Sequence, residues 1–96
     1  MDYNDIIGAL KAERQFLYTE FGVLSIGLFG SFVRGEQQEN SDLDILVEID
    51  NPNFDRLSGL LIYLEKRFGK RVELIRKNPK QKNLFIKKLE NEVIYA

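Results

Sequence analysis

Cysteine and histidine are both absent from this chain of 96 residues, and each absence removes a class of chemistry. Without cysteine there is no disulfide bond, no thiolate metal site and no cysteine nucleophile, which fits a protein of a reducing compartment. Without histidine there is no Ser-His-Asp triad and no histidine ligand for zinc. Any catalysis must therefore use carboxylates, hydroxyls, lysine, arginine and backbone amides.

Long hydrophobic runs are missing as well. No apolar stretch reaches the ~20 residues of a membrane helix, and the early Asp2 and Asp5 do not fit a secretory signal. Hydrophobic residues make up 44% of the chain and charged residues 30%, a balance typical of folded domains. The length allows one domain. We therefore expect a single cytoplasmic domain over residues 1–96, with no membrane contact.

Charge is nearly balanced overall, at −1, but it is unevenly distributed along the chain. Residues 1–65 carry 12 acids and 4 bases, whereas residues 66–96 carry 3 acids and 10 bases. Such asymmetry indicates a surface that faces an anion, an acidic partner or nucleic acid. Solvated helix faces and loop lysines explain it equally well, so charge alone leaves the partner open.

Hydrophobic periodicity predicts helices that alternate with strands. Helices are expected over residues 2–21, 31–34 and 83–90, with another that starts at Asn51-Pro52 and ends at Gly69. Strands are expected over residues 23–29, 41–50 and 71–75, a turn at Asn78-Pro79, and a short strand or helix end at residues 93–95. This order predicts an α/β (α+β) fold, a small mixed β-sheet flanked by helices.

Gly30 and Ser31 stand where the first predicted strand ends and a short helix begins. Glycine lets the backbone approach a ligand closely, and a helix start offers unpaired N–H groups. The Ser31 hydroxyl adds a hydrogen-bonding group for a phosphate oxygen. Taken alone, Gly-Ser is also a common turn and cap pair.

Asp42 and Asp44 open the second predicted strand, where alternation places both carboxylates on one face. Two like charges so close repel each other, and a divalent cation such as Mg²⁺ or Mn²⁺ relieves that cost. Taken alone, the pair also fits a polar strand face next to Ser41. A phosphate-binding turn after one strand and a carboxylate pair on the next together favour metal-assisted phosphoryl or nucleotidyl transfer. Arg34 is positioned to pair with a phosphate or to hold one of the two aspartates.

The segment GSFVRGEQQENSDLDILV, with ten residues between Ser31 and Asp42, resembles the signature of minimal nucleotidyltransferases in the DNA polymerase beta superfamily. The resemblance covers nearly the whole chain. It implies that Gly30 and Ser31 hold the outer phosphates of a nucleoside triphosphate and that Asp42 and Asp44 bind two Mg²⁺ ions, or Mn²⁺. It also implies a third acid that binds metal and activates the attacking hydroxyl; that position falls on Glu73, where the family usually has Asp.

Stand-alone domains of this size resemble the MntA-type antitoxins of HEPN/MNT toxin–antitoxin systems in prokaryotes. That resemblance implies a protein adenylyltransferase that moves AMP from ATP to a tyrosine of its HEPN-domain toxin. Its main alternative is a binding module of the same fold that neutralises the partner by contact alone, an alternative supported by the longer Glu73. Nucleotidyl transfer to a small molecule is a further alternative, although such enzymes usually need a second domain. Direct nucleic-acid binding is not expected, because the lysines lack interleaved aromatics.

Overall fold

The computed structural model describes residues 1–78, 80 and 83–96, and in that part of the chain helices and strands alternate as expected. The elements in chain order are α1 (Tyr3–Ala12), α2 (Arg14–Phe21), β1 (Val23–Phe29), α3 (Ser31–Arg34), β2 (Leu43–Ile49), α4 (Phe54–Phe68), β3 (Val72–Arg76), α5 (Leu84–Glu90) and β4 (Ile94–Tyr95). None of the helices described here is both long and apolar enough to cross a membrane.

The strands form one mixed sheet in the order β3-β2-β1-β4. β1 pairs antiparallel with β2 on one side and with β4 on the other, whereas β2 and β3 run parallel. A parallel pair needs a long crossover connection, and α4 supplies it. A mixed sheet flanked by helices confirms the predicted fold class.

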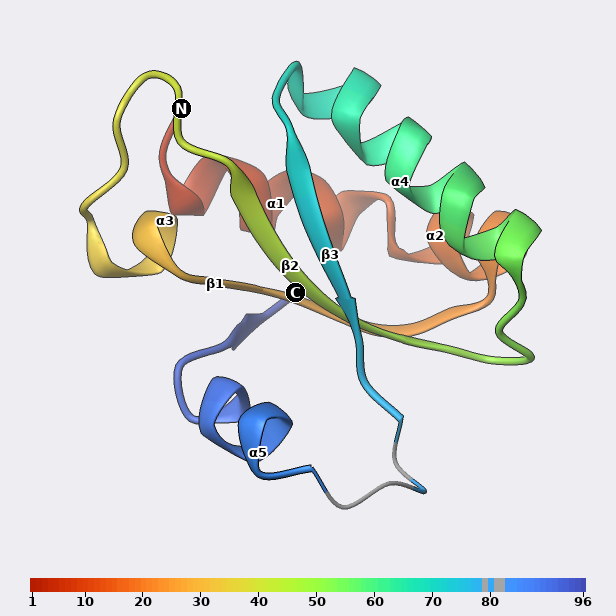
Figure 1. Cartoon of the computed structure of the whole chain (residues 1–96). Coiled ribbons are helices and arrows are strands. Elements are labelled where there is room, and N and C mark those ends of the chain that lie inside the picture. The colour runs from red at the N-terminus through yellow and green to blue at the C-terminus, as the bar shows by residue number, and fades with distance from the viewer. Residues whose placement is uncertain (79, 81–82) are drawn as a thin grey trace.

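Helices cover the two faces of the sheet unequally (Figure 1). On the face covered by α1, α2 and α4, the main core takes from β2 the side chains of Leu43, Ile45, Val47 and Ile49. On the opposite face, which we call the α5 face, α5 packs Leu89 against Phe29 and Leu46. Leu46 interrupts the polar side of β2 in the sequence, and α5 is the reason that this apolar side chain is buried. Asp44, two residues earlier, lies on the same face as Leu46.

The single helix predicted over residues 2–21 is wrong, because the chain turns at Glu13 and forms two helices. Glu13 leaves the helical conformation with φ −100° and ψ 8°. Its carboxylate accepts hydrogen bonds from the Tyr63 hydroxyl and, at 2.8 Å, from Nε of Arg67. Both partners lie on α4, so the turn joins the N-terminal helices to a helix about fifty residues later in the sequence.

The remaining boundaries are close to those predicted. α4 begins three residues after Asn51, because the side chain of Asn53 caps it by accepting the N–H of Arg56 at 2.9 Å. β3 is displaced by one residue, and the tail forms β4 rather than a helix end. Gly27 makes room for β4, since a Cβ there would overlap a methyl group of Val93. The turn expected at Asn78-Pro79 includes Pro79, which lies outside the described residues.

Candidate active site

The sheet register brings three strand positions side by side on its α5 face. Asp44, near the start of β2, stands opposite Phe29 at the end of β1. On its other side Asp44 is level with Glu73 of β3. The central strand therefore places an aspartate between the Gly30-Ser31 turn and the third acid expected from the sequence.

Gly30 touches the carboxylate of Asp44 directly. A Cβ at this position would overlap Oδ2 of Asp44, and its φ of +77° lies in the region that favours glycine. The sequence suggests that glycine is needed here for approach to a phosphate. The structure adds a second reason, which is that the backbone must leave space for the aspartate of the neighbouring strand.

Ser31 opens α3, a single helical turn that directly follows Gly30. The turn is closed by the N–H groups of Val33 and Arg34, which donate to the carbonyl of Gly30 at 3.1 and 3.2 Å. Phe32 is buried in the main core and anchors the turn to the sheet. The half-buried Ser31 is thus held at the rim of the site by the residue that follows it.

Asp44 has a strongly perturbed carboxyl group. Burial, a hydrogen bond with Glu73 and the negative charges of Glu73 and Asp42 together raise the pKa of Asp44 from 3.8 to about 6, against a smaller opposing effect of Arg34. The fold therefore disfavours the charged form of Asp44.

Carboxylate oxygens are the ligands that Mg²⁺ and Mn²⁺ prefer, so the chemistry of Asp42, Asp44 and Glu73 fits a divalent cation. Asp44 and Glu73 meet, whereas Asp42 is exposed and precedes the first residue of β2. Within residues 1–78, 80 and 83–96, no three acidic side chains are already arranged around one point. The donor chemistry fits the metal, and binding would require these side chains to gather around it.

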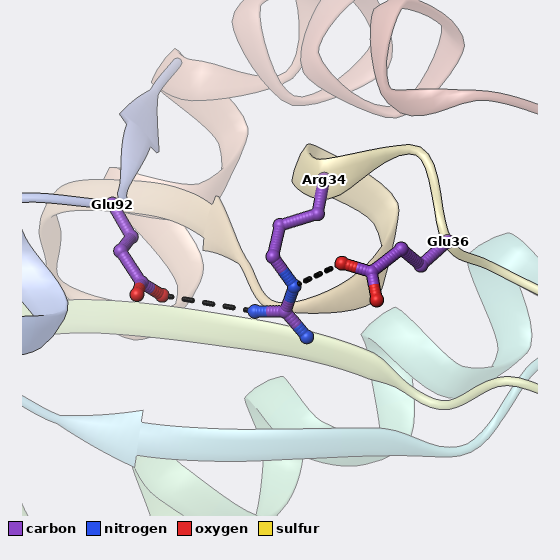
Figure 2. A network of polar contacts seen from close by, with 3 residues as sticks. All are labelled: Arg34, Glu36 and Glu92. Atoms are coloured by element: carbon purple, nitrogen blue, oxygen red, sulfur yellow. Dashed lines mark hydrogen bonds and ion pairs between the residues drawn. The ribbon is translucent and has the colours of Figure 1, made fainter.

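Arg34 contacts acids other than the predicted ones. Its Nε donates to Glu36 at 2.7 Å, and its Nη1 lies 3.8 Å from a carboxylate oxygen of Glu92 (Figure 2). In the described part of the chain it makes no bidentate bond to Asp42 or Asp44. These ion pairs are about half exposed and can be exchanged for another anion at small cost. Phosphate binding by Arg34 thus remains a prediction.

Two hollows border the strands that carry these acids. The larger, about 440 Å³, lies at the far end of β2, and its lining includes Glu48, Asp50 and Arg76. The smaller, about 170 Å³, adjoins Asp42 and is lined by the loop before β2 together with Lys70 and Arg71. We place the chemistry beside the smaller hollow, because the acid cluster lies at that end of the sheet. The sequence alone gave no role to Lys70, since a lysine after a helix-ending glycine has no motif to identify it.

Known proteins resemble this chain over almost its whole length. A sequence profile described as a nucleotidyltransferase domain matches residues 9–96. The chain is 40% identical to a Methanocaldococcus jannaschii protein provisionally named as a protein adenylyltransferase, over 97% of this chain and 96% of that one. It is also 40% identical to the protein adenylyltransferase MntA of Thermococcus cleftensis, over 96% of this chain and 93% of that one.

Solved structures show the same fold. A structure provisionally described as a minimal nucleotidyltransferase matches with a TM-score of 0.69 and 28% identity, covering 98% of this chain and 95% of that one. A toxin–antitoxin structure with AMP-PNP matches with a TM-score of 0.68 and 22% identity, covering 88% and 70%. At 22% identity, the match to the toxin–antitoxin structure shows only that the two chains share a fold.

Proposed function

The chain belongs to the nucleotidyltransferase domain family and is a nucleotidyltransferase, and from this premise we propose that it is the antitoxin of a toxin–antitoxin pair. It transfers AMP from ATP to a tyrosine hydroxyl of a cognate HEPN-domain toxin. The support is the name of the Thermococcus cleftensis relative, a protein adenylyltransferase, at 40% identity over almost the full length of both chains. The fold shared with a component of a toxin–antitoxin complex is consistent with such a partner.

One observation favours an enzyme over a module that only binds its partner. Asp44 sits against the Gly30 backbone on one side, and Glu73 on the other side contributes to the raised pKa of Asp44. A partly buried aspartate with a raised pKa, pressed against a tight glycine turn, is costly to maintain for stability alone. Nucleotidyl transfer uses both parts, because one binds the triphosphate and the other binds cations.

Each residue then has a distinct task. Gly30 and Ser31 bind the outer phosphates, and Arg34 pairs with a phosphate after leaving Glu36 and Glu92. Asp42, Asp44 and Glu73 would hold two Mg²⁺ ions, or Mn²⁺, and the bound cations supply charge stabilisation for the attacking and leaving oxygens.

The reaction forms a bond between the tyrosine oxygen and the α-phosphorus of ATP and breaks the bond to pyrophosphate, which leaves. The Glu73 carboxylate accepts the proton of the tyrosine hydroxyl. Glutamate is one methylene longer than the aspartate usual in the family, and Glu73 lies level with Asp44 on the neighbouring strand.

The remaining parts of the proposal follow from size and composition. Residues 1–96 act as one minimal domain, and the toxin itself provides the surface that holds the acceptor tyrosine. The lack of cysteine fits the cytoplasm of a prokaryote. The exposed basic side chains of the C-terminal third, including Arg76 and Lys88, suit an acidic partner surface.

The test uses the purified chain with its HEPN partner, ATP and Mg²⁺, followed by intact-mass spectrometry of the partner. We expect a gain of one or more AMP units, and no gain with the Asp42→Asn, Asp44→Asn double variant. Asp50→Asn is the matched control, because it removes an exposed acid just beyond the far end of the same strand. A stable complex without any mass gain would replace the enzyme with a module that neutralises by contact.

A further inference from the structure

The loop of residues 37–42 connects the phosphate-binding turn to the aspartate pair. It is folded locally by a turn in which the N–H of Gln38 donates to Oγ of Ser41 at 2.7 Å and the N–H of Ser41 donates to the carbonyl of Gln38 at 3.0 Å. Asp42 follows this turn and is exposed. Asp42 therefore lies between this loop and Leu43, the buried first residue of β2, so the loop is one of the two segments that set its position.

The side chain of Lys70 bonds this loop to the rest of the fold. Its Nζ donates to the carbonyl oxygen of Glu39 at 2.9 Å. Within the residues that the structure describes, this is the one hydrogen bond that joins the loop to another part of the fold. The same Nζ lies 5.5 Å from the centre of the Phe32 ring, within the range of a cation–π contact. Lys70 thus connects the loop before Asp42 with α3, the helical turn that carries Ser31.

The backbone around Lys70 is fixed at several points. The N–H of Gly69 donates to the carbonyl of Glu65 at 2.8 Å and ends α4. The side chain of Glu65 accepts the N–H of Val72 at 3.0 Å. The carbonyl of Arg71 accepts the N–H of Leu43 at 2.9 Å, so this segment is also bonded to the start of β2. The backbone that carries the half-buried Lys70 is therefore anchored on both sides.

The geometry points to Lys70 as a positioning residue for Asp42 in the nucleotidyl-transfer site, and this inference rests on the proposed function. Lys70 sets the loop that ends at Asp42 and holds it in register with the phosphate-binding turn. It acts through the Glu39 carbonyl and the Phe32 ring and does not touch the reacting atoms. Residues that orient a metal ligand from outside commonly change metal affinity or activity by about tenfold or more when removed.

The test compares Lys70→Met, which keeps an apolar stem but removes the charge and the donor, with Lys70→Arg, which keeps both. Lys66→Met is the control, because it removes an exposed lysine from the last turn of α4. Amide hydrogen exchange of residues 37–42 in the metal-free protein is the first readout. The second is Mg²⁺ affinity by titration without ATP, and the third is AMP transfer to the partner.

For Lys70→Met we expect faster exchange over residues 37–42, about tenfold weaker Mg²⁺ binding and slower transfer. We expect Lys70→Arg to restore all three properties and Lys66→Met to leave them unchanged. If Lys70→Met does not fold, Lys70→Gln replaces it with the same expectations. Unchanged exchange and Mg²⁺ affinity, or equal effects of Lys66→Met, would overturn the inference. Absence of transfer by the unmodified chain would refute the proposed function instead, while exchange and titration would still decide the role of Lys70.

Discussion

Asp44 is held in an environment that disfavours its charge, so removing that charge should make the metal-free protein more stable. Asp44→Asn keeps the shape of the side chain and removes the ionisation. The pKa of this group is 3.8 in an unfolded chain and about 6 in the fold. That difference corresponds to about 3 kcal/mol at full effect. Because Asp44 is partly exposed and water screens the repulsion, we expect a gain of about 1 kcal/mol.

The pH dependence follows from the direction of the shift. A pKa raised on folding means that the favourable contribution is complete below about pH 4, where Asp44 is protonated in both states. It is lost as the pH rises through about 6, where the folded protein must ionise Asp44 beside Glu73. The advantage of Asp44→Asn should therefore be present in full at pH 7.5 and reduced to about a third at pH 4.5.

Urea denaturation with EDTA at both pH values measures this advantage, and at pH 7.5 the melting temperature should rise by about 5 °C. Excess Mg²⁺ should stabilise the unmodified chain but not the variant. Glu48→Gln is the control, because it removes a half-buried acid from the same strand but at its far end, beside the hollow that Arg76 lines. This variant should give no gain in stability. A variant less stable than the unmodified chain at pH 7.5, or an advantage equal at both pH values, would refute the account of the Asp44–Glu73 pair.

Three further substitutions test other parts of the structure. Gly30→Ala should lower the free energy of unfolding by about 2 kcal/mol and weaken Mg²⁺ binding, because its Cβ would meet Asp44. Gly35→Ala is the control: only its positive φ is unfavourable, so urea denaturation should show a smaller loss of stability. Leu46→Ala should cost about 2–5 kcal/mol and speed hydrogen exchange in α5, because Leu46 is fully buried beneath that helix; unchanged exchange would contradict the packing. Arg34→Gln should change stability by less than about 1 kcal/mol, because its ion pairs are half exposed, yet raise the half-saturating ATP concentration about tenfold through a lost charged hydrogen bond; equal ATP dependence would remove Arg34 from the site.

The sequence by itself determined the features that depend on residues close together in the chain. Alternation along residues 43–49 identified β2 and its buried face, because side chains of a strand point to opposite sides in turn. Gly30 and Gly35, which require positive φ, bracket the short helix α3 as the sequence predicts. The Asp42 and Asp44 spacing predicts a cation site, and in the structure Asp44 lies in β2 while Asp42 directly precedes it.

The tertiary structure decided what depends on residues far apart in the chain. The turn at Glu13 is bonded to Tyr63 and Arg67 of a distant helix, and no sequence pattern near Glu13 predicts these partners. The parallel register of β2 and β3 places Glu73 beside Asp44, and this contact adds to burial in raising the pKa of Asp44. Lys70 reaches the loop before Asp42 for the same reason. Periodicity records which face of an element is buried, whereas the partner across the sheet is fixed only when the whole chain packs.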